Sequence, residues 1–304
     1  MKRRELLKLG VATGVALYTP SILAASRTSW LPRASNSNQP WLKIAVQQYS
    51  FNKQLRAGDL KIEDFPKIVV EGTGIKALEY FNGHMEDKVD DTAFFKRLRK
   101  RCDDLGAVNT LMLCRSKPAI DSPQAKIRQQ AIEGYRPWLA ATKTLGGKFI
   151  RVDTRQKGDA IEQKKHAIEG LTALSAVAAE YEMGILVENH GGHSGNGKWL
   201  ADVMSGVQLD NCGTLPDFQN FKEYDPYQGV AEMMPFAKVL CAKAKSFDDQ
   251  GNESNVDFRR MLKIAKEGGF KGYIGIEFEG HEIEPIEGIQ KTKALIEKVV
   301  RELG

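Results

Sequence analysis

The amino-acid sequence predicts an α/β protein, a (β/α)8 barrel formed by a single domain. Short apolar segments of strand length recur along the chain, and glycines repeatedly precede them, as at helix C-caps. The segment starts lie roughly 26 to 40 residues apart, which is the size of a strand–helix unit. The eight predicted strands are residues 44–49, 75–80, 108–113, 148–152, 185–188, 212–217, 239–243 and 273–277.

The segments between the predicted strands have the apolar spacing of amphipathic helices. Phe94, Leu98 and Cys102 recur at intervals of four, and Leu171 and Leu174 belong to a similar face that ends before Gly184. The alternative is a doubly wound open sheet, in which a glycine-rich turn is expected after the first strand. Residues 47–51 contain no glycine, so the barrel is favoured.

The first 25 residues have the pattern of a twin-arginine signal peptide. Arg3 and Arg4 precede an uncharged stretch that ends in the small residues Ala24 and Ala25. An uncleaved membrane anchor is the alternative, but the glycine, threonine and proline content of this stretch argues against it. We therefore predict a signal peptide over residues 1–25, a flexible linker over 26–42 and the barrel over 43–304. Recognition by the twin-arginine export machinery and a periplasmic location follow.

Charge and cysteine usage exclude several classes of protein. The net charge is +5, of which residues 1–25 contribute +3, and no arginine-rich stripe with interleaved aromatic residues follows. Nucleic acid is therefore not an expected partner, and the sequence yields no prediction of oligomeric state. The cysteines form no Cys-x-x-Cys pair, which excludes a zinc ribbon and a thioredoxin-like motif. They are Cys102, Cys114, Cys212 and Cys241.

Polar residues gather at the predicted ends of the strands. The segment 184–193 changes abruptly from apolar residues to Glu188, Asn189 and His190. Strand ends converge on one pocket in a barrel, so Glu188, Asp217 and Glu277 are expected to approach one another. Three ionised carboxylates need a compensating cation, and one divalent metal ion, Mn²⁺ or Mg²⁺ by ligand preference, would supply it. Ion pairs with Lys243, Lys245 or Arg151 are the alternative.

Four of these strand ends resemble a known family. Residues 187–192, 215–221, 242–248 and 276–280 are similar to strand-end motifs of the sugar phosphate isomerase/epimerase family, the xylose isomerase-like TIM barrels. The resemblance extends from about residue 44 to 300. It implies a divalent metal held by Glu188, Asp217 and Glu277, with a histidine as the remaining ligand.

The sequence departs from the family at that histidine. Cys241 occupies its place, two residues before Lys243. A cysteine thiolate binds zinc well but is softer than Mn²⁺ or Mg²⁺ prefers. Either the ligand set has changed, or His190 or His193 substitutes, or the metal is weak or absent; we expect three carboxylates with a nearby histidine.

The resemblance also implies proton transfer next to a sugar carbonyl. Glu188 and Glu277 are then the acid/base pair, and Lys243 polarises the carbonyl or binds a hydroxyl group, unless it only balances charge. Candidate substrate contacts follow from their places at the predicted strand ends. They are Gln48, Glu79, His190 and Asn220.

Three functions are open at this point. The chain is predicted to be exported and contains no glycine-rich phosphate cradle, so we expect a neutral carbohydrate or keto-sugar substrate. The first function is a metal-dependent isomerase or epimerase that works through an enediolate. The second is a 3-keto-glycoside lyase or hydratase with the same enolate chemistry. The third is a non-catalytic periplasmic carbohydrate-binding barrel, which the cysteine at 241 favours and the clustered carboxylates oppose.

Overall fold

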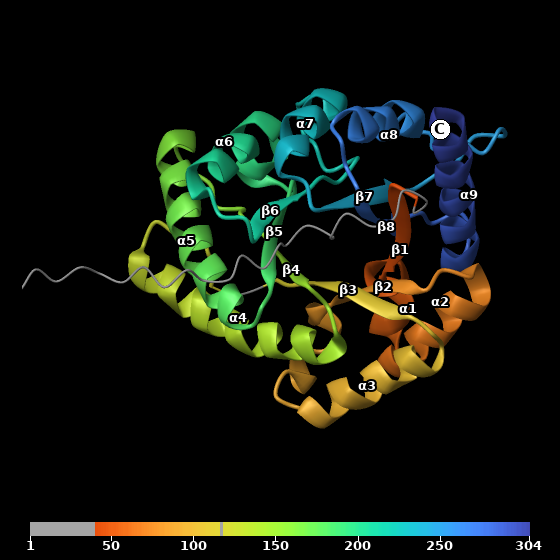
Figure 1. Ribbon diagram of the computed structural model, residues 1–304, viewed down its shortest axis with the longest axis horizontal. Helices are drawn as coiled ribbons and strands as arrows, with labels where there is room; N and C mark the ends of the chain where they lie inside the picture. The colour runs from red at the N-terminus through yellow and green to blue at the C-terminus, as the bar shows by residue number, and fades with distance from the viewer. Residues whose placement is uncertain (1–39, 116–117) are drawn as a thin grey trace, which may run out of the picture.

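The computed structural model describes residues 40–115 and 118–304 and confirms the (β/α)8 barrel. The predicted signal peptide and most of the predicted linker lie outside the described residues, so both remain predictions. Eight parallel strands form one sheet in the order β6-β5-β4-β3-β2-β1-β8-β7 (Figure 1). The strands are β1 (Leu42–Gln47), β2 (Ala77–Phe81), β3 (Val108–Leu113), β4 (Phe149–Val152), β5 (Gly184–Glu188), β6 (Cys212–Leu215), β7 (Val239–Ala244) and β8 (Gly272–Phe278).

The register of the last strands brings the predicted site residues opposite one another. In the β7–β8 ladder, Lys243 pairs with Glu277. Strands β6 and β7 meet through isolated parallel bridges, one of which joins Asp217 to Cys241. This narrow contact completes the ring of strands. The side chains of Asp217, Cys241, Lys243 and Glu277 therefore start from adjacent backbone positions.

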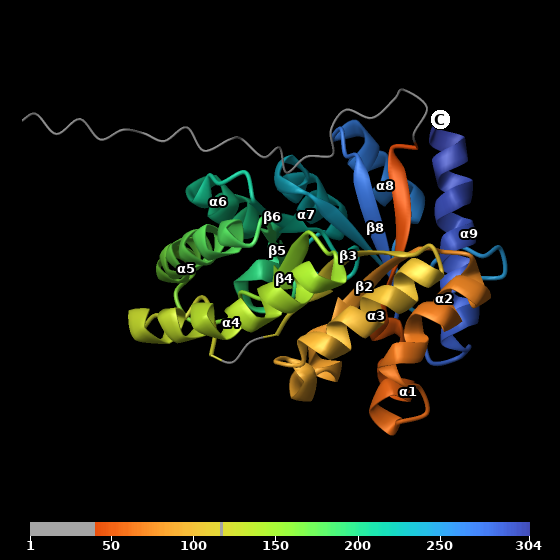
Figure 2. The ribbon, with the colours of Figure 1, turned by 60° about the horizontal axis from the view of Figure 1, so that its bottom comes forward.

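Helices surround the strands, and most begin at an acidic or amide cap. Asp159, for example, accepts hydrogen bonds from the backbone N–H groups of Ile161 and Glu162 at the start of α5. Figure 2 shows α9 alongside β1 and β8, which it contacts. The α-helices are α1 (Asn52–Ala57), α2 (Phe65–Thr73), α3 (Thr92–Asp104), α4 (Ala125–Leu145), α5 (Ala160–Glu180), α6 (Gly197–Val207), α7 (Pro226–Met233), α8 (Phe258–Glu267) and α9 (Pro285–Leu303).

Short 3-10 helices occupy several of the connections. They are η1 (Gln48–Phe51), η2 (Ile62–Asp64), η3 (Asn82–His84), η4 (Glu86–Lys88), η5 (Gly192–Gly195) and η6 (Met234–Phe236). No helix in the described part of the chain combines the length and apolar character needed to cross a membrane.

Side-chain alternation along the strands separates two apolar regions. A large cluster that includes Ile150, Val187 and Ile276 packs between the strands and the helices. A second, smaller cluster includes Leu186, Leu215 and Cys241 and fills the interior of the barrel. Because successive strand residues point to opposite faces, Glu188 follows Leu186 and Lys243 follows Cys241 on the interior side. The polar residues thus form the layer above the apolar interior.

The packing of α6 against α7 yields a stability prediction. A Cβ atom at Gly197 would lie 2.4 Å from the backbone Cα of Gly229, and backbone cannot move aside cheaply. We expect Gly197→Ala to reduce the free energy of unfolding by about 1–3 kcal/mol, the usual cost of overpacking. Chemical denaturation measures this loss. Gly195→Ala is the matched control, because its nearest atom would be 3.8 Å away; equal stability of the two variants would contradict the prediction.

Candidate active site

Glu188 is held at the end of β5 by two polar partners. Its Oε1 accepts a hydrogen bond of 2.7 Å from Asn220 Nδ2. Its Oε2 lies 2.8 Å from Arg151 Nε, an ion pair rather than an aligned hydrogen bond. The Glu188 side chain is 2% exposed and that of Arg151 is 3% exposed. The carboxylate is thus fixed in position with little access to bulk water.

Asp217, Cys241 and Glu277 form a second group across the barrel mouth. The Cys241 thiol lies 3.2 Å from Asp217 Oδ2 and 3.4 Å from Glu277 Oε2, donating to these oxygens. Lys243 Nζ lies 3.1 Å from Glu277 Oε2 and 3.5 Å from Asp217 Oδ2. It also lies 3.4 Å from Glu279 Oε1, so one ammonium group faces three carboxylates.

Asn189 and a turn after β6 fix the position of Asp217. The Asn189 amide accepts from the Asp217 N–H at 2.7 Å and donates to the Asp217 carbonyl at 3.0 Å. Asp217 Oδ1 accepts from the backbone N–H groups of Gln219 and Asn220. This leaves Oδ2 directed to Cys241 and Lys243. The turn also places the Asn220 side chain on Glu188, which links the two groups.

Burial and charge set different pKa values for the two glutamates. Burial raises the pKa of Glu188 to about 8, assisted by Asp217 and Glu277 and opposed by Arg151. Burial also acts to raise the pKa of Glu277, but Lys243 and Arg151 outweigh it and hold that pKa below its usual value. The site therefore contains one carboxyl that retains its proton easily and one that is ionised.

Lys243 and Cys241 respond to the same carboxylates. Burial acts to lower the pKa of Lys243, but Asp217 and Glu277 raise it above its ordinary value, so the amine is an ammonium. Burial raises the pKa of the Cys241 thiol, and the same two carboxylates raise it further. Without an additional cation the thiol is protonated, in agreement with its role as hydrogen-bond donor.

Three side chains are placed where they could hold a metal ion. Ligand atoms of Asp217, Cys241 and Glu277 all lie within 4.8 Å of one another, and all three residues are buried. Two carboxylates and a thiol fit a divalent cation, and the sulfur fits zinc better than Mn²⁺ or Mg²⁺. Glu188 faces Arg151 and lies outside this group, so its role as a metal ligand remains a prediction. Within residues 40–115 and 118–304, no histidine belongs to the group.

The two histidines after β5 lie in different surroundings. The His190 backbone N–H donates to Ser194 Oγ, and burial lowers the pKa of its ring to about 3, with Arg151 adding to the effect. The ring of His190 is therefore neutral. His193 Nε2 lies 2.9 Å from the Gly158 carbonyl oxygen, and its ring packs near Trp199. Gly158 precedes α5, so this contact ties His193 to the β4–α5 connection.

The remaining predicted contacts lie deeper or toward β1. Gln48 Oε1 accepts a hydrogen bond from the Phe81 N–H, which ties η1 to β2. Glu79 Oε1 accepts from Thr110, and a Cβ at Gly275 would lie 2.3 Å from Glu79 Oε2, so glycine makes room for this carboxyl. Burial raises the pKa of Glu79 to about 8. Among the described residues, Glu79 Oε2 and Gln48 Nε2 have no hydrogen-bond partner.

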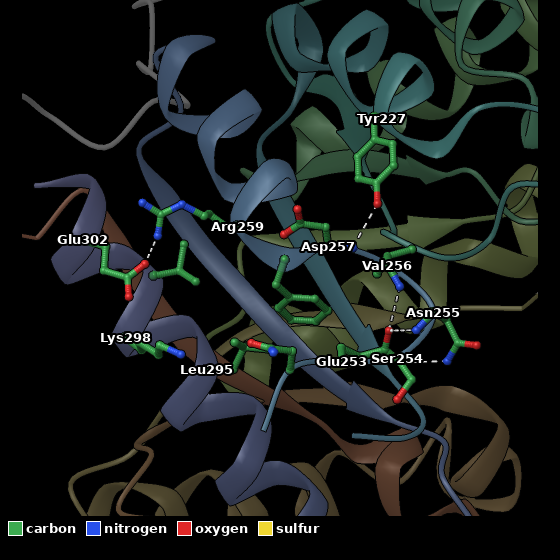
Figure 3. A pocket seen from close by; sticks show the side chains of 13 residues that line it. Tyr227, Glu253, Ser254, Asn255, Val256, Asp257, Arg259, Leu295, Lys298 and Glu302 are labelled. Atoms are coloured by element: carbon green, nitrogen blue, oxygen red, sulfur yellow. Dashed lines mark hydrogen bonds and ion pairs between the residues drawn. The ribbon is translucent and has the colours of Figure 1, made fainter. Parts of the chain in front are cut away.

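One cavity adjoins this site, and another lies away from it. A cavity of about 660 Å³ is lined by Tyr49, Phe278 and Glu279, and Glu279 contacts Lys243. A second cavity, of about 590 Å³, lies between the loop before α8 and helix α9 (Figure 3). Tyr227 and Asp257 contribute to its wall, and none of the predicted site residues does.

Several residues of the site were not predicted from the sequence. Asn189 lies within the Glu-Asn-His segment, and Glu279 lies two residues after Glu277, a spacing that places both on the same side of an extended segment. Arg115 follows β3 and Arg155 follows β4, and no sequence motif surrounds either residue. Only alternation and position at a strand end could have identified these residues.

Comparisons with known proteins agree with this architecture. The family model described as xylose isomerase-like TIM barrel matches residues 69–299. A zinc-containing IolI protein structure has a TM-score of 0.69 at 17% identity and covers 86% of this chain and 98% of its own. A 3-keto-D-glucoside 4-epimerase from E. coli has a TM-score of 0.66 at 14% identity, covering 84% and 99%. At these identities the two structures show a shared fold.

A curated relative matches a shorter region. The C-glycoside deglycosidase alpha subunit of Arthrobacter globiformis is 31% identical over 83 residues. This match spans 25% of the chain and 24% of that subunit. The chain therefore aligns with about a quarter of the relative's length.

The metal group can be tested by elemental analysis. We expect about one equivalent of a divalent metal in the purified protein, and Cys241→Ala to lower zinc affinity at least tenfold because one of three converging ligands is lost. Cys212→Ala, on β6 outside the group, is the control and should retain the metal. Equal metal content in both variants would remove Cys241 from the ligand set.

Proposed function

Because the chain belongs to the xylose isomerase-like TIM barrel family, we propose that it is a sugar isomerase or epimerase that transfers a proton next to a carbonyl group. The observation that supports this most is the pair of buried glutamates at the barrel mouth, which a chain of polar contacts joins. Asn220 contacts Glu188 and Asp217, and Lys243 contacts Asp217 and Glu277. Proton transfer at carbon needs a base whose pKa lies near the working pH and a fixed charge that stabilises the developing oxyanion. Glu188 and Lys243 match these two requirements.

Glu188 is the proposed base. Its deprotonated carboxylate takes the proton from the carbon beside the carbonyl, the C–H electron pair forms a carbon–carbon double bond, and the carbonyl oxygen becomes an enediolate oxygen. Asn220 and Arg151 hold the two Glu188 oxygens, so the carboxylate need not reorient before the transfer. Delivery of a proton to the opposite face of the same carbon completes epimerisation, and delivery to the neighbouring carbon completes isomerisation.

Lys243 and Glu277 are proposed to act on the oxygen side of the reaction. The Lys243 ammonium donates hydrogen bonds to a carbonyl or hydroxyl oxygen. Glu277, the second member of the proposed acid/base pair, is ionised in the resting site and returns a proton only after taking one up from solvent. A divalent cation held by Asp217, Cys241 and Glu277 would supply Lewis-acid stabilisation of the negative oxygen. Gln48, Glu79 and His190 are proposed contacts for the remaining sugar hydroxyls. The protein is proposed to act in the periplasm, on the basis of its twin-arginine pattern.

Proton transfer can be tested by exchange with solvent deuterium. We expect the protein, supplied with Zn²⁺ or Mn²⁺, to exchange a carbon-bound proton of D-fructose, D-tagatose or a 3-keto-D-glucoside, and Glu188→Gln to slow this exchange by about 10²–10⁴-fold. NMR of the sugar measures the loss of the proton signal. Exposed Glu297→Gln on α9 is the control. Absence of exchange with every sugar would support the carbohydrate-binding alternative instead.

The pKa of Glu188 predicts the direction of the pH dependence. Only the deprotonated carboxylate accepts a proton, and the pKa of Glu188 is raised to about 8. We therefore expect kcat/KM to rise with pH up to about 8 and then to level off. Exchange rates measured across pH 5 to 9.5 test this. A rate that falls as pH rises through this range would assign the base to another group.

A lyase acting on 3-keto-glycosides is the second candidate. The local similarity to a C-glycoside deglycosidase subunit favours it. Removal of the proton beside a 3-keto group by Glu188 gives the same enolate, which then expels the substituent at the neighbouring carbon instead of regaining a proton. The base and the oxyanion stabilisation are therefore common to both reactions, and the fate of the enolate separates them.

Product analysis distinguishes the two candidates. With a 3-keto-glucoside, the lyase predicts release of the aglycone and an unsaturated sugar, whereas the epimerase predicts an isomer of unchanged mass. Chromatography with mass spectrometry measures both. Glu188→Gln is expected to abolish either product. An intact substrate that exchanges deuterium without any aglycone would exclude the lyase.

A further inference from the structure

We propose that the substrate carries a carboxylate group, bound by three arginines at the ends of β3 and β4, which we call the arginine cluster: Arg115, Arg151 and Arg155. This inference rests on the proposed function, because it names the class of sugar that the same site accepts. It replaces the expectation of a neutral carbohydrate with that of a sugar acid.

All three guanidinium groups converge on a single carboxylate, Asp153. Arg151 Nη1 lies 2.5 Å from Asp153 Oδ1 and makes a hydrogen bond. Arg155 Nη2 lies 3.2 Å and Arg115 Nε 3.8 Å from Asp153 Oδ2, both outside hydrogen-bonding geometry. One carboxylate cannot satisfy three guanidinium groups, each of which has five N–H donors.

The cluster retains positive charge and unused donors. Among the described residues, the three guanidinium groups form ion pairs with Asp153 and, through Arg151, with Glu188. At least one positive charge there thus has no matching carboxylate even when Glu188 is ionised. Within residues 40–115 and 118–304, the buried Nε atoms of Arg115 and Arg155 have no hydrogen-bond acceptor. Buried donors without partners are costly, and a bound anion would supply the acceptors.

The cluster adjoins both the proposed base and the solvent. Arg151 is buried and contacts Glu188, whereas the side chains of Arg115 and Arg155 are 38% and 36% exposed. The guanidinium of Arg115 also lies over the rings of Tyr49 in η1 and Phe81 in β2. An anion that enters from solvent thus meets Arg115 and Arg155 first. Once it is bound there, the reacting carbon of the substrate lies next to Glu188.

The opposite side of the barrel mouth does not compete for an anion. There Lys243 is already surrounded by Asp217, Glu277 and Glu279. A sugar acid therefore has one preferred orientation, with its carboxylate toward β3 and β4 and its hydroxyls toward β7 and β8. We choose a carboxylate over a phosphate because one positive charge is unmatched when Glu188 acts as an ionised base, and a monoanion balances it. Guanidinium groups can hold that carboxylate through two parallel hydrogen bonds.

Titration calorimetry with three probes tests the proposal. D-glucuronate, D-glucose and D-glucose 6-phosphate share one ring and differ in the group at one end. We expect glucuronate to bind at least tenfold more tightly than either of the others, and added salt to weaken its binding. The double variant R115Q/R155Q should lose that preference. Arg97→Gln is the matched control, because the Arg97 side chain on α3 is exposed, and this variant should behave like the parent protein.

A variant of opposite sign excludes a merely structural role for the cluster. Asp153→Asn removes the competing carboxylate and should raise the affinity for glucuronate several-fold, whereas a structural role predicts that both sets of variants bind less. Equal binding of glucuronate and glucose, stronger binding of the phosphate ester, or an unchanged preference in R115Q/R155Q would overturn the proposal.

These binding measurements test the anion proposal separately from the proposed isomerase reaction. Equilibrium binding needs no proton transfer, so the glucuronate preference should persist in Glu188→Gln. A preference for glucuronate without any deuterium exchange would contradict the isomerase proposal alone. Deuterium exchange together with equal binding of glucuronate and glucose would contradict the anion proposal alone.

Discussion

The site depends on Lys243 lying among Asp217, Glu277 and Glu279 inside the barrel mouth. Carboxylates buried from water are stable as anions only when a cation compensates for the lost hydration. Lys243 provides that charge from the strand between those that carry Asp217 and Glu277. The Cys241 thiol below it donates to the same two oxygens. The ammonium group is thus part of the scaffold as well as a candidate catalytic group.

A second charge balance holds the other half of the site. Arg151 faces Glu188 and Asp153 together, and its buried guanidinium prevents these carboxylates from being isolated in the interior. The compensation is incomplete at Glu188, since its pKa is raised to about 8 despite Arg151. A carboxyl group in this condition exchanges its proton near neutral pH. Incomplete compensation is therefore what suits Glu188 to acid/base chemistry.

The two halves give the barrel mouth an uneven charge distribution. Three carboxylates at the ends of β6 and β8 surround the single ammonium group on β7, and guanidinium groups dominate at the ends of β3 and β4. Asn220 joins the halves by donating to Glu188 from the turn that Asp217 stabilises. A polar substrate lying across the mouth would meet cations on one side and acceptors on the other. Orientation of the substrate then follows from charge.

The sequence by itself determined the barrel and the strand-end location of its polar residues. Repeating apolar segments of strand length require burial on both sides, and each of the eight matches a strand of the structure. Alternation was also readable, because Glu188 follows Leu186 by two residues on a short strand. The family resemblance on four strand ends agrees with the matched family model.

Only the tertiary structure decided which polar groups pair. The strand-end positions of Glu188, Asp217 and Glu277 left open either a shared cation or ion pairs such as one with Arg151; in the structure Glu188 contacts Arg151 and Asn220. The meeting of Arg115, Arg151 and Arg155 at Asp153 was not foreseen either. Pairing depends on side-chain direction and on distances between strands remote in sequence, and neither is encoded in local spacing. Residue types and the spacing of apolar residues determine the barrel, whereas three-dimensional proximity determines which charged side chains pair in the site.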